Sequence, residues 1–370
     1  MDIAQFKKSQ FRDDIKDVVM ACDALRNDPN EAVDISFAEM VRMRHQVSMD
    51  AYYEDLGFNA SVDTIQNLFT TGDANTRWLI PEIIRDALQL GLRKTPIYPN
   101  VIAAEQSVPN PTLTLPHWNM SDAMPKYVGE AETIPLGSLS YGEKTLTIRK
   151  MGRGLKIPYE VVQYVTANIF GIFLQDFGVK LGMGIDSLLI DMLVNGEQAD
   201  GSESAPVIGT ASGTSIVYKD ILTIWVRMSR VGRSPQLMIS GEVMAVDIMD
   251  LDEFKLRQNP FPPEKGFNLK TPIPNSTDMY IHGSVADDQS IIVDRTGAVI
   301  KYNAQPLLVE NDKIVSSQVL ETYASLTTGF GILYRDARIV LDRSVTIGAS
   351  PFPAYMDVDI LEQETITKNH

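Results

Sequence analysis

The most regular pattern of apolar positions follows Pro158 and continues to residues 195–196. Apolar side chains recur there at three- and four-residue steps, the spacing of one face of an α-helix. The pattern predicts one long helix, or two helices with a break. Gly178, Gly182 and Gly184 each lower helix stability by up to ~1 kcal/mol relative to alanine, so we expect a bend or a closely packed crossing element there. The side chains expected to face the core are Val165, Phe173, Phe177, Leu181, Leu188 and Leu189.

A different pattern precedes this helix. Residues 94–118 contain repeated prolines with an alternating Thr-Leu-Thr-Leu segment at 112–115, which predicts extended chain. Between residues 127 and 158, glycines separate strand-like pieces, and the clearest alternation covers residues 145–148. We interpret residues 121–157 as a long two-stranded arm. It has few large apolar residues, so such a hairpin would be marginal in water unless it lies on another surface.

The first 75 residues are rich in helix signals. Ser36 and Glu39 have the spacing of a capping box, and apolar residues follow on one face until Gly57. A helix over about residues 36–56 is predicted, then a short helix over residues 62–69. A third helix begins near Pro81, because proline is tolerated in the first turn.

The second half of the chain mixes helices and strands. A polar Gly/Ser-rich connection over residues 197–215 marks a boundary. Beyond it the sequence predicts helices at 218–230 and 242–255 and strands at 236–239, 279–282 and 290–302, with a turn at 294–297; mostly strand follows from 307 to 341. The element order is that of an α+β protein without a regular βαβ repeat.

Composition narrows the function classes. The chain has 370 residues, 44% hydrophobic and 22% charged, as in folded globular proteins. Its formal net charge of −15 argues against wrapping of nucleic acid by the subunit as a whole. Cys22 is the only cysteine, so no disulfide forms within one chain, and a reducing cytoplasm suits it. No apolar run approaches the ~20 residues of a membrane span, and no secretory signal opens the sequence.

Several segments resemble one known family in their order along the chain. They are Leu-Ile-Pro at 79–81, residues 128–135, Lys-Ile-Pro at 156–158, residues 185–190, Asn-Gly at 195–196, residues 291–297 and residues 328–337. This order is similar to the tailed-phage major capsid protein family, with the Hong Kong phage-type fold that encapsulins share. The resemblance covers roughly residues 76–347, about three quarters of the chain. The helical first 70 residues depart from the family pattern.

The resemblance implies a structural subunit of an icosahedral shell, built from hexamers and pentamers of identical chains around packaged double-stranded DNA, which the subunit contacts non-specifically. Scaffolding, portal and decoration proteins are the other implied partners; no membrane is involved. The implied location is the virion, after assembly in the bacterial host cytoplasm. The implied organisation is an N-terminal helical arm (1–75), the start of the peripheral domain (76–120), an extended loop (121–157), the spine helix of the peripheral domain (158–204), the axial domain (205–305), return strands of the peripheral domain (306–348) and a C-terminal tail (349–370).

The extended loop is expected to contact a neighbouring subunit. Some family members join a loop lysine to an asparagine of another subunit; Lys144 lies in this loop, although a solvated lysine is the simpler interpretation. The residues expected in this contact are Tyr127, Val128, Gly129, Glu130, Glu132, Tyr141, Lys144, Leu146 and Ile148.

No catalytic, cofactor-binding or metal-binding residues are predicted. The chain has no Gly-Lys step for a phosphate-binding loop and no Gly-x-Ser-x-Gly elbow. Its four histidines are scattered, and none has the partner four residues away that zinc on a helix requires. Two alternatives to a phage capsid protein stay open: an encapsulin, which would share the fold, and an acidic soluble hydrolase. The N-terminal extension favours the phage protein over an encapsulin.

Overall fold

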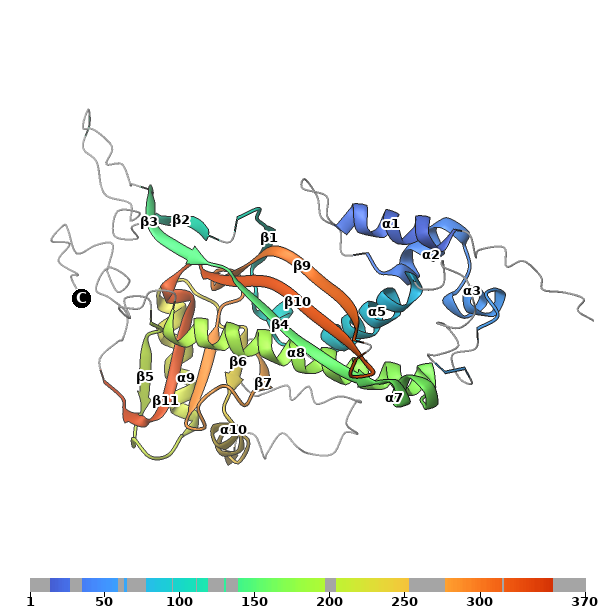
Figure 1. Cartoon of the computed structure of the whole chain (residues 1–370). Helices are drawn as coiled ribbons and strands as arrows, with labels where there is room; N and C mark the ends of the chain where they lie inside the picture. Colours follow the sequence, from blue (N-terminus) through green and yellow to red (C-terminus); the bar gives the residue numbers. More distant parts are fainter. Residues whose placement is uncertain are drawn as a thin grey trace, which may run out of the picture.

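The computed structural model describes residues 14–26, 35–58, 63–64, 78–94, 96–110, 112–118, 130, 139–196, 204–252, 277–314 and 316–348. Helices and strands mix along the chain, and the described strands form sheets of four, five and two strands (Figure 1). The predicted α+β class is therefore confirmed.

The N-terminal helices form a small unit with its own apolar core, which also contains Leu79 from the next helix. The predicted capping box is confirmed: the Glu39 amide donates to the Ser36 hydroxyl at 3.1 Å, and the Ser36 amide donates to the Glu39 carboxylate at 3.0 Å. The helix predicted over 36–56 is in fact two helices, because Gln46 adopts a left-handed φ of 58° and Ser48 caps a new start. The helices are α1 (Ile15–Arg26), α2 (Phe37–His45) and α3 (Met49–Asp55).

Gly57 follows α3 with a φ of 77°, a left-handed conformation that favours glycine and ends the helical region. The short helix predicted over residues 62–69 lies outside the described residues, except for 63–64.

The long helical pattern forms two helices, α7 (Tyr159–Tyr164) and α8 (Ala167–Asn195). The break falls at residues 165–166, and α8 continues through the glycines where a bend was one expectation. The other expectation, a closely packed crossing element, is confirmed, because α5 (Leu79–Lys94) crosses α8 at Gly178. The short helix α6 (Tyr98–Val101) follows α5.

A four-stranded sheet lies against α8, in the order β1-β9-β10-β4 (Figure 1). Its apolar face joins α5 and α8 in the main core, in which Leu88, Leu174 and Phe330 are fully buried. The strands are β1 (Ala104–Ser107), β4 (Arg149–Pro158), β9 (Val299–Ile314) and β10 (Val319–Ile332).

A five-stranded sheet, in the order β5-β11-β8-β6-β7, makes up the second lobe with α9 (Tyr218–Arg230) and α10 (Glu242–Met249). Alternate side chains of its central strands face opposite sides: Ile291 joins the main core, whereas Ile292 joins a second core that includes side chains of α9 and α10. The strands are β5 (Val207–Thr210), β6 (Leu237–Ser240), β7 (Asp278–Ile281), β8 (Gln289–Val293) and β11 (Arg338–Thr346).

The sheets differ from the predicted domain bounds in two places. The segment 306–348 was expected to return to the peripheral domain, but β11 pairs with β8 in the five-stranded sheet, from Arg338 opposite Val293 to Asp342 opposite Gln289. Conversely, β9 begins at Val299, before the expected boundary at 305, and runs unbroken into the four-stranded sheet. The last crossing between the lobes therefore lies between β10 and β11.

Candidate assembly surface

The predicted arm exists, but its two strands are not the expected pair. Strand β3 (Leu139–Thr147) pairs antiparallel with β2 (Thr112–Trp118), from Thr112 opposite Thr147 to Trp118 opposite Leu139. Strand β4, expected inside the arm, pairs instead with β10. The register of β2 and β3 shifts at Pro116, which cannot donate to a ladder and is tolerated at such an irregularity. The arm therefore spans residues 112–147 rather than 121–157.

The base of the arm is fixed to its own chain. Leu146 and Ile148 are each only 3% exposed and pack with Val108 and Tyr302 in a small cluster. This corrects the expectation that Leu146 and Ile148 contact another subunit. Leu146 and Ile148 are two residues apart in extended chain, so their side chains point to the same face, which meets β9. Their burial anchors the arm to the four-stranded sheet.

Three of the other expected contact residues of the loop are described by the structure. Tyr141 and Lys144 occupy β3 positions opposite Pro116 and Leu115, and Glu130 is exposed. Tyr127, Val128, Gly129 and Glu132 lie outside the described residues.

The predicted core residues, five on α8 and Val165 just before it, fall into two groups. Leu189 is fully buried, and Val165, Phe177, Leu181 and Leu188 are partly buried against the same core. Phe173, in contrast, is 63% exposed, so its assignment to the core was wrong. The inward positions are taken by Phe170 and Leu174. Helix α8 carries apolar residues on both of its faces. The apolar spacing in the sequence therefore fits either face as the buried one.

The outward face of α8 carries an exposed apolar stripe, defined here as Ile169, Ile172 and Phe173. These side chains are 50%, 64% and 63% exposed, and Tyr164 at the end of α7 is 75% exposed. Exposed apolar groups that gather on one face mark interaction sites more often than scattered ones do. The sequence signal for this stripe is the spacing of three and four residues from Ile169; of its three members, only Phe173 was predicted to face the core.

The N-terminal unit is attached to α5 by buried charged groups that the sequence analysis missed. The Arg26 guanidinium donates to both Glu82 carboxylate oxygens, at 3.0 and 2.9 Å, and to the Ile35 carbonyl at 2.9 Å. One turn along α5, Asp86 accepts a hydrogen bond of 3.3 Å from the Phe37 amide at the start of α2. Burial, with nearby Glu82, raises the pKa of Asp86 to about 6.

This raised pKa predicts a pH effect on stability. The Asp86 carboxyl holds its proton more tightly in the folded protein than at its ordinary pKa of 3.8, so stability falls as pH rises from about 4 to about 6. In Asp86→Asn, the stability of the subunit is expected to vary less across this window. The amide oxygen of asparagine still accepts from Phe37. Urea midpoints at several pH values measure the effect, with Asp50→Asn, an exposed site on α3, as the control.

An Asp86→Asn profile that follows the wild type across the window, while Asp50→Asn does the same, would show that Asp86 has no raised pKa.

Two further properties of the described residues bear on function. Among them, no group of three or more His, Cys, Asp or Glu side chains is arranged to hold a metal ion. None of the described helices has both the length and the apolar character that crossing a membrane requires.

Comparisons with known proteins identify the fold. No protein-family model and no curated protein sequence matches the chain. A solved structure from Microbacterium phage Oxtober96 has a TM-score of 0.50 at 12% identity, over 67% of this chain and 90% of that chain. A virus-like particle from Pyrococcus furiosus has a TM-score of 0.47 at 12% identity, over 70% and 98%. The holo-SrpI encapsulin complex from Synechococcus elongatus PCC 7942 has a TM-score of 0.46 at 13% identity, over 68% and 88%.

At these identities the similarity is one of fold. The chain shares its fold with the structure from Microbacterium phage Oxtober96, and this is the Hong Kong phage-type fold that the order of its sequence segments resembled.

Proposed function

We propose that this chain is the major capsid protein of a tailed phage, a structural subunit that assembles as hexamers and pentamers into an icosahedral shell. The arm carries the proposal. It is a separate two-stranded sheet, fixed at its base by Leu146 and Ile148, and Figure 1 shows it at the end of the four-stranded sheet far from α5 and α7. Two strands alone bury too little apolar surface to be stable in water, so the arm needs a surface outside its own subunit.

The apolar stripe of α8 provides a surface of the required kind. Ile169, Ile172 and Phe173 are exposed on a helix that is rigidly held by the main core on its other side. In the proposed shell, the arm of one copy lies on the outer surface of the next, and burial of such side chains stabilises the contact. Each contact is repeated around every capsomer, so modest affinities combine into a stable shell.

The remaining expectations follow from the same proposal. The shell encloses double-stranded DNA, which the acidic subunit contacts non-specifically, and scaffolding, portal and decoration proteins assemble with it. Assembly takes place in the bacterial host cytoplasm, and the mature protein resides in the virion. The subunit has a structural rather than a catalytic role. An encapsulin shell around protein cargo is the alternative, and the additional N-terminal unit with its own core favours the phage protein.

Replacing residues 119–138 with a short Gly/Ser turn tests the arm. This change keeps β2 and β3 but removes the segment that connects them. The expected result is a folded subunit with an unchanged melting temperature, because neither main core loses a residue, and the loss of stable shells. Circular dichroism measures the first property, and size-exclusion chromatography with electron microscopy measures the second.

The matched control replaces the polar segment 197–203 with Gly/Ser residues of equal length and is expected to keep the shells. Normal shells from the arm variant would contradict the proposed role of the arm. Wild-type shells filled with protein instead of DNA would favour the encapsulin, and monomers with hydrolytic activity would favour the acidic hydrolase.

A further inference from the structure

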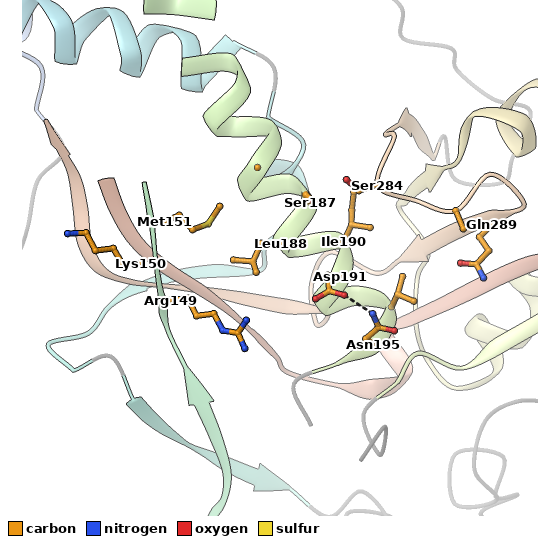
Figure 2. A pocket seen from close by; sticks show the side chains of 13 residues that line it. Arg149, Lys150, Met151, Ser187, Leu188, Ile190, Asp191, Asn195, Ser284 and Gln289 are labelled. Carbon is orange, nitrogen blue, oxygen red and sulfur yellow. Dashed lines mark hydrogen bonds between the residues drawn. The ribbon is translucent and has the colours of Figure 1, made fainter. Parts of the chain in front are cut away.

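The five-stranded sheet of the second lobe has one face toward its own chain. Side chains of this face join the main core with α8, and Gln289 at the start of β8 borders a cavity of about 640 Å³ that Leu188 and Asp191 line from α8 (Figure 2). Helices α9 and α10 cover the opposite face, where Ile224 and Ile248 belong to the second core. The outer sides of α9 and α10 are therefore turned away from α8.

The outer side of α9 is basic around an exposed valine. Val226 is 68% exposed. Lys219 lies seven residues before it and Arg230 four residues after it, which places all three on one side of the helix, and both cations are exposed. Arg227 adds a further cation in the last turn. No carboxylate is exposed on α9, whose thirteen residues are all described, because Asp220 is buried.

The outer side of α10 is acidic around a residue of the same kind. Val246 is 61% exposed, and the exposed residues Glu242 and Asp250 lie four residues before it and four residues after it. Helix α10 contains no Lys or Arg. Asp247 is paired with Arg343 of β11, so the net negative charge of this side comes from Glu242 and Asp250.

The two outer sides match in spacing and in charge. Four residues of an α-helix rise ~6 Å, so Arg230 comes opposite Asp250 or Glu242, depending on the helix direction, when Val226 lies on Val246. Such a contact buries two exposed apolar side chains between opposite charges, a complementarity that selects the partner. Because α9 and α10 of one chain lie on the same face of one sheet, their outer sides cannot pack on each other within that chain.

We propose that α9 of one copy of this chain packs on α10 of the next copy, with Val226 on Val246 and Lys219 and Arg230 facing the carboxylates of α10. The inference rests on the proposed function and names one contact of its hexamers and pentamers. The contact is heterologous, because it joins two different surfaces, so each copy binds one neighbour through α9 and another through α10. A succession of such contacts closes into a ring.

Mixed single-cysteine chains test the contact whether or not shells form. Full-length Val226→Cys and Val246→Cys, mixed in equal amounts and oxidised, are expected to give about tenfold more disulfide-linked dimer than either chain alone. The native Cys22 is buried and does not compete. The matched control mixes Val226→Cys with Ile281→Cys, at a residue of β7 that is 52% exposed, and should give no such increase. Non-reducing electrophoresis measures the dimer.

Charge reversal provides a second test. Lys219→Glu/Arg230→Glu and Glu242→Lys/Asp250→Lys are each expected to raise the protein concentration needed for assembly about tenfold. A chain with all of these changes reverses both sides and should assemble as the wild type does. In an equal mixture of the two reversed chains, only unlike chains attract. They should therefore alternate and form hexamers but no pentamers, because an alternating ring has an even number of members.

The outcomes separate this contact from the shell itself. Equal dimer yields in the Val246→Cys mixture and in the Ile281→Cys control would overturn the contact. Assembly that is insensitive to charge reversal would also overturn it, as would pentamers from the alternating mixture or cross-links that form only with added double-stranded DNA. A strong Val226→Cys/Val246→Cys dimer from copies that never form hexamers or pentamers would keep the contact and contradict the proposed function instead.

Discussion

Replacing Gly178 by alanine is expected to destabilise the subunit by about 3 kcal/mol or more, at the upper end of the cost of overpacking a core. A Cβ atom at Gly178 would lie 2.3 Å from the Leu88 carbonyl oxygen and 3.1 Å from the Gly91 Cα atom. Both neighbours are backbone atoms, so no side-chain rotation relieves the clash, and α5 must move away from α8. Chemical denaturation of the unassembled subunit measures the loss.

Gly171 is the matched control, because it lies in the same helix but has no atom within 4 Å of the added Cβ. Gly171→Ala is expected to raise stability by up to ~1 kcal/mol, since alanine is the better helix former. The reciprocal variant Gly91→Ala should resemble Gly178→Ala, as its Cβ would lie 2.1 Å from the Gln175 carbonyl oxygen. Similar stabilities for Gly178→Ala and Gly171→Ala would mean that the helices do not cross at these glycines.

Arg26→Ala is expected to lower stability by about 3–5 kcal/mol, the usual cost of removing one partner of a buried ion pair. The side chains of Arg26 and Glu82 are 1% and 6% exposed, so the substitution leaves a carboxylate that is buried and without its cation. The loss should appear first in the N-terminal unit, as earlier proteolysis of residues 14–58 than in the wild type.

The double variant Arg26→Met/Glu82→Leu distinguishes the ion pair from the packing around it. Replacing both charges by apolar side chains of similar size is often neutral, so this variant is expected to recover most of the stability lost in Arg26→Ala. If Arg26→Ala lost less than about 1 kcal/mol, the pair would behave as an exposed one, and its burial between α1 and α5 would be refuted.

Local signals accounted for most of the elements. Three such signals each depend on the spacing of neighbouring residues: the capping box at Ser36 and Glu39, the helical spacing before residues 195–196, and the turn at 294–297. The structure has α2, α8 and the β8–β9 turn at these positions. The turn is closed by the Asp294 side chain, which accepts hydrogen bonds from the Thr296 amide at 3.0 Å and the Thr296 hydroxyl at 2.6 Å. The order of such elements was also enough to predict the fold.

The candidate assembly surface depended on tertiary structure to a greater extent. The apolar spacing of α8 is compatible with two phases, and only packing against the four-stranded sheet turned Leu174 inward and Phe173 outward. The arm was predicted as a feature, but its anchor at Leu146 and Ile148 was not, because burial there depends on Tyr302, which is more than 150 residues away in the sequence.

The amino-acid sequence by itself determined which segments are helix, strand or turn, because propensity, capping and periodicity act over a few residues. Tertiary structure decided which strands pair. It gave β3 to β2, β4 to β10 and β11 to the second lobe, and it brought Arg26 to Glu82 across 56 residues. Those choices depend on the burial and hydrogen bonding of the whole chain, and no local pattern encodes them.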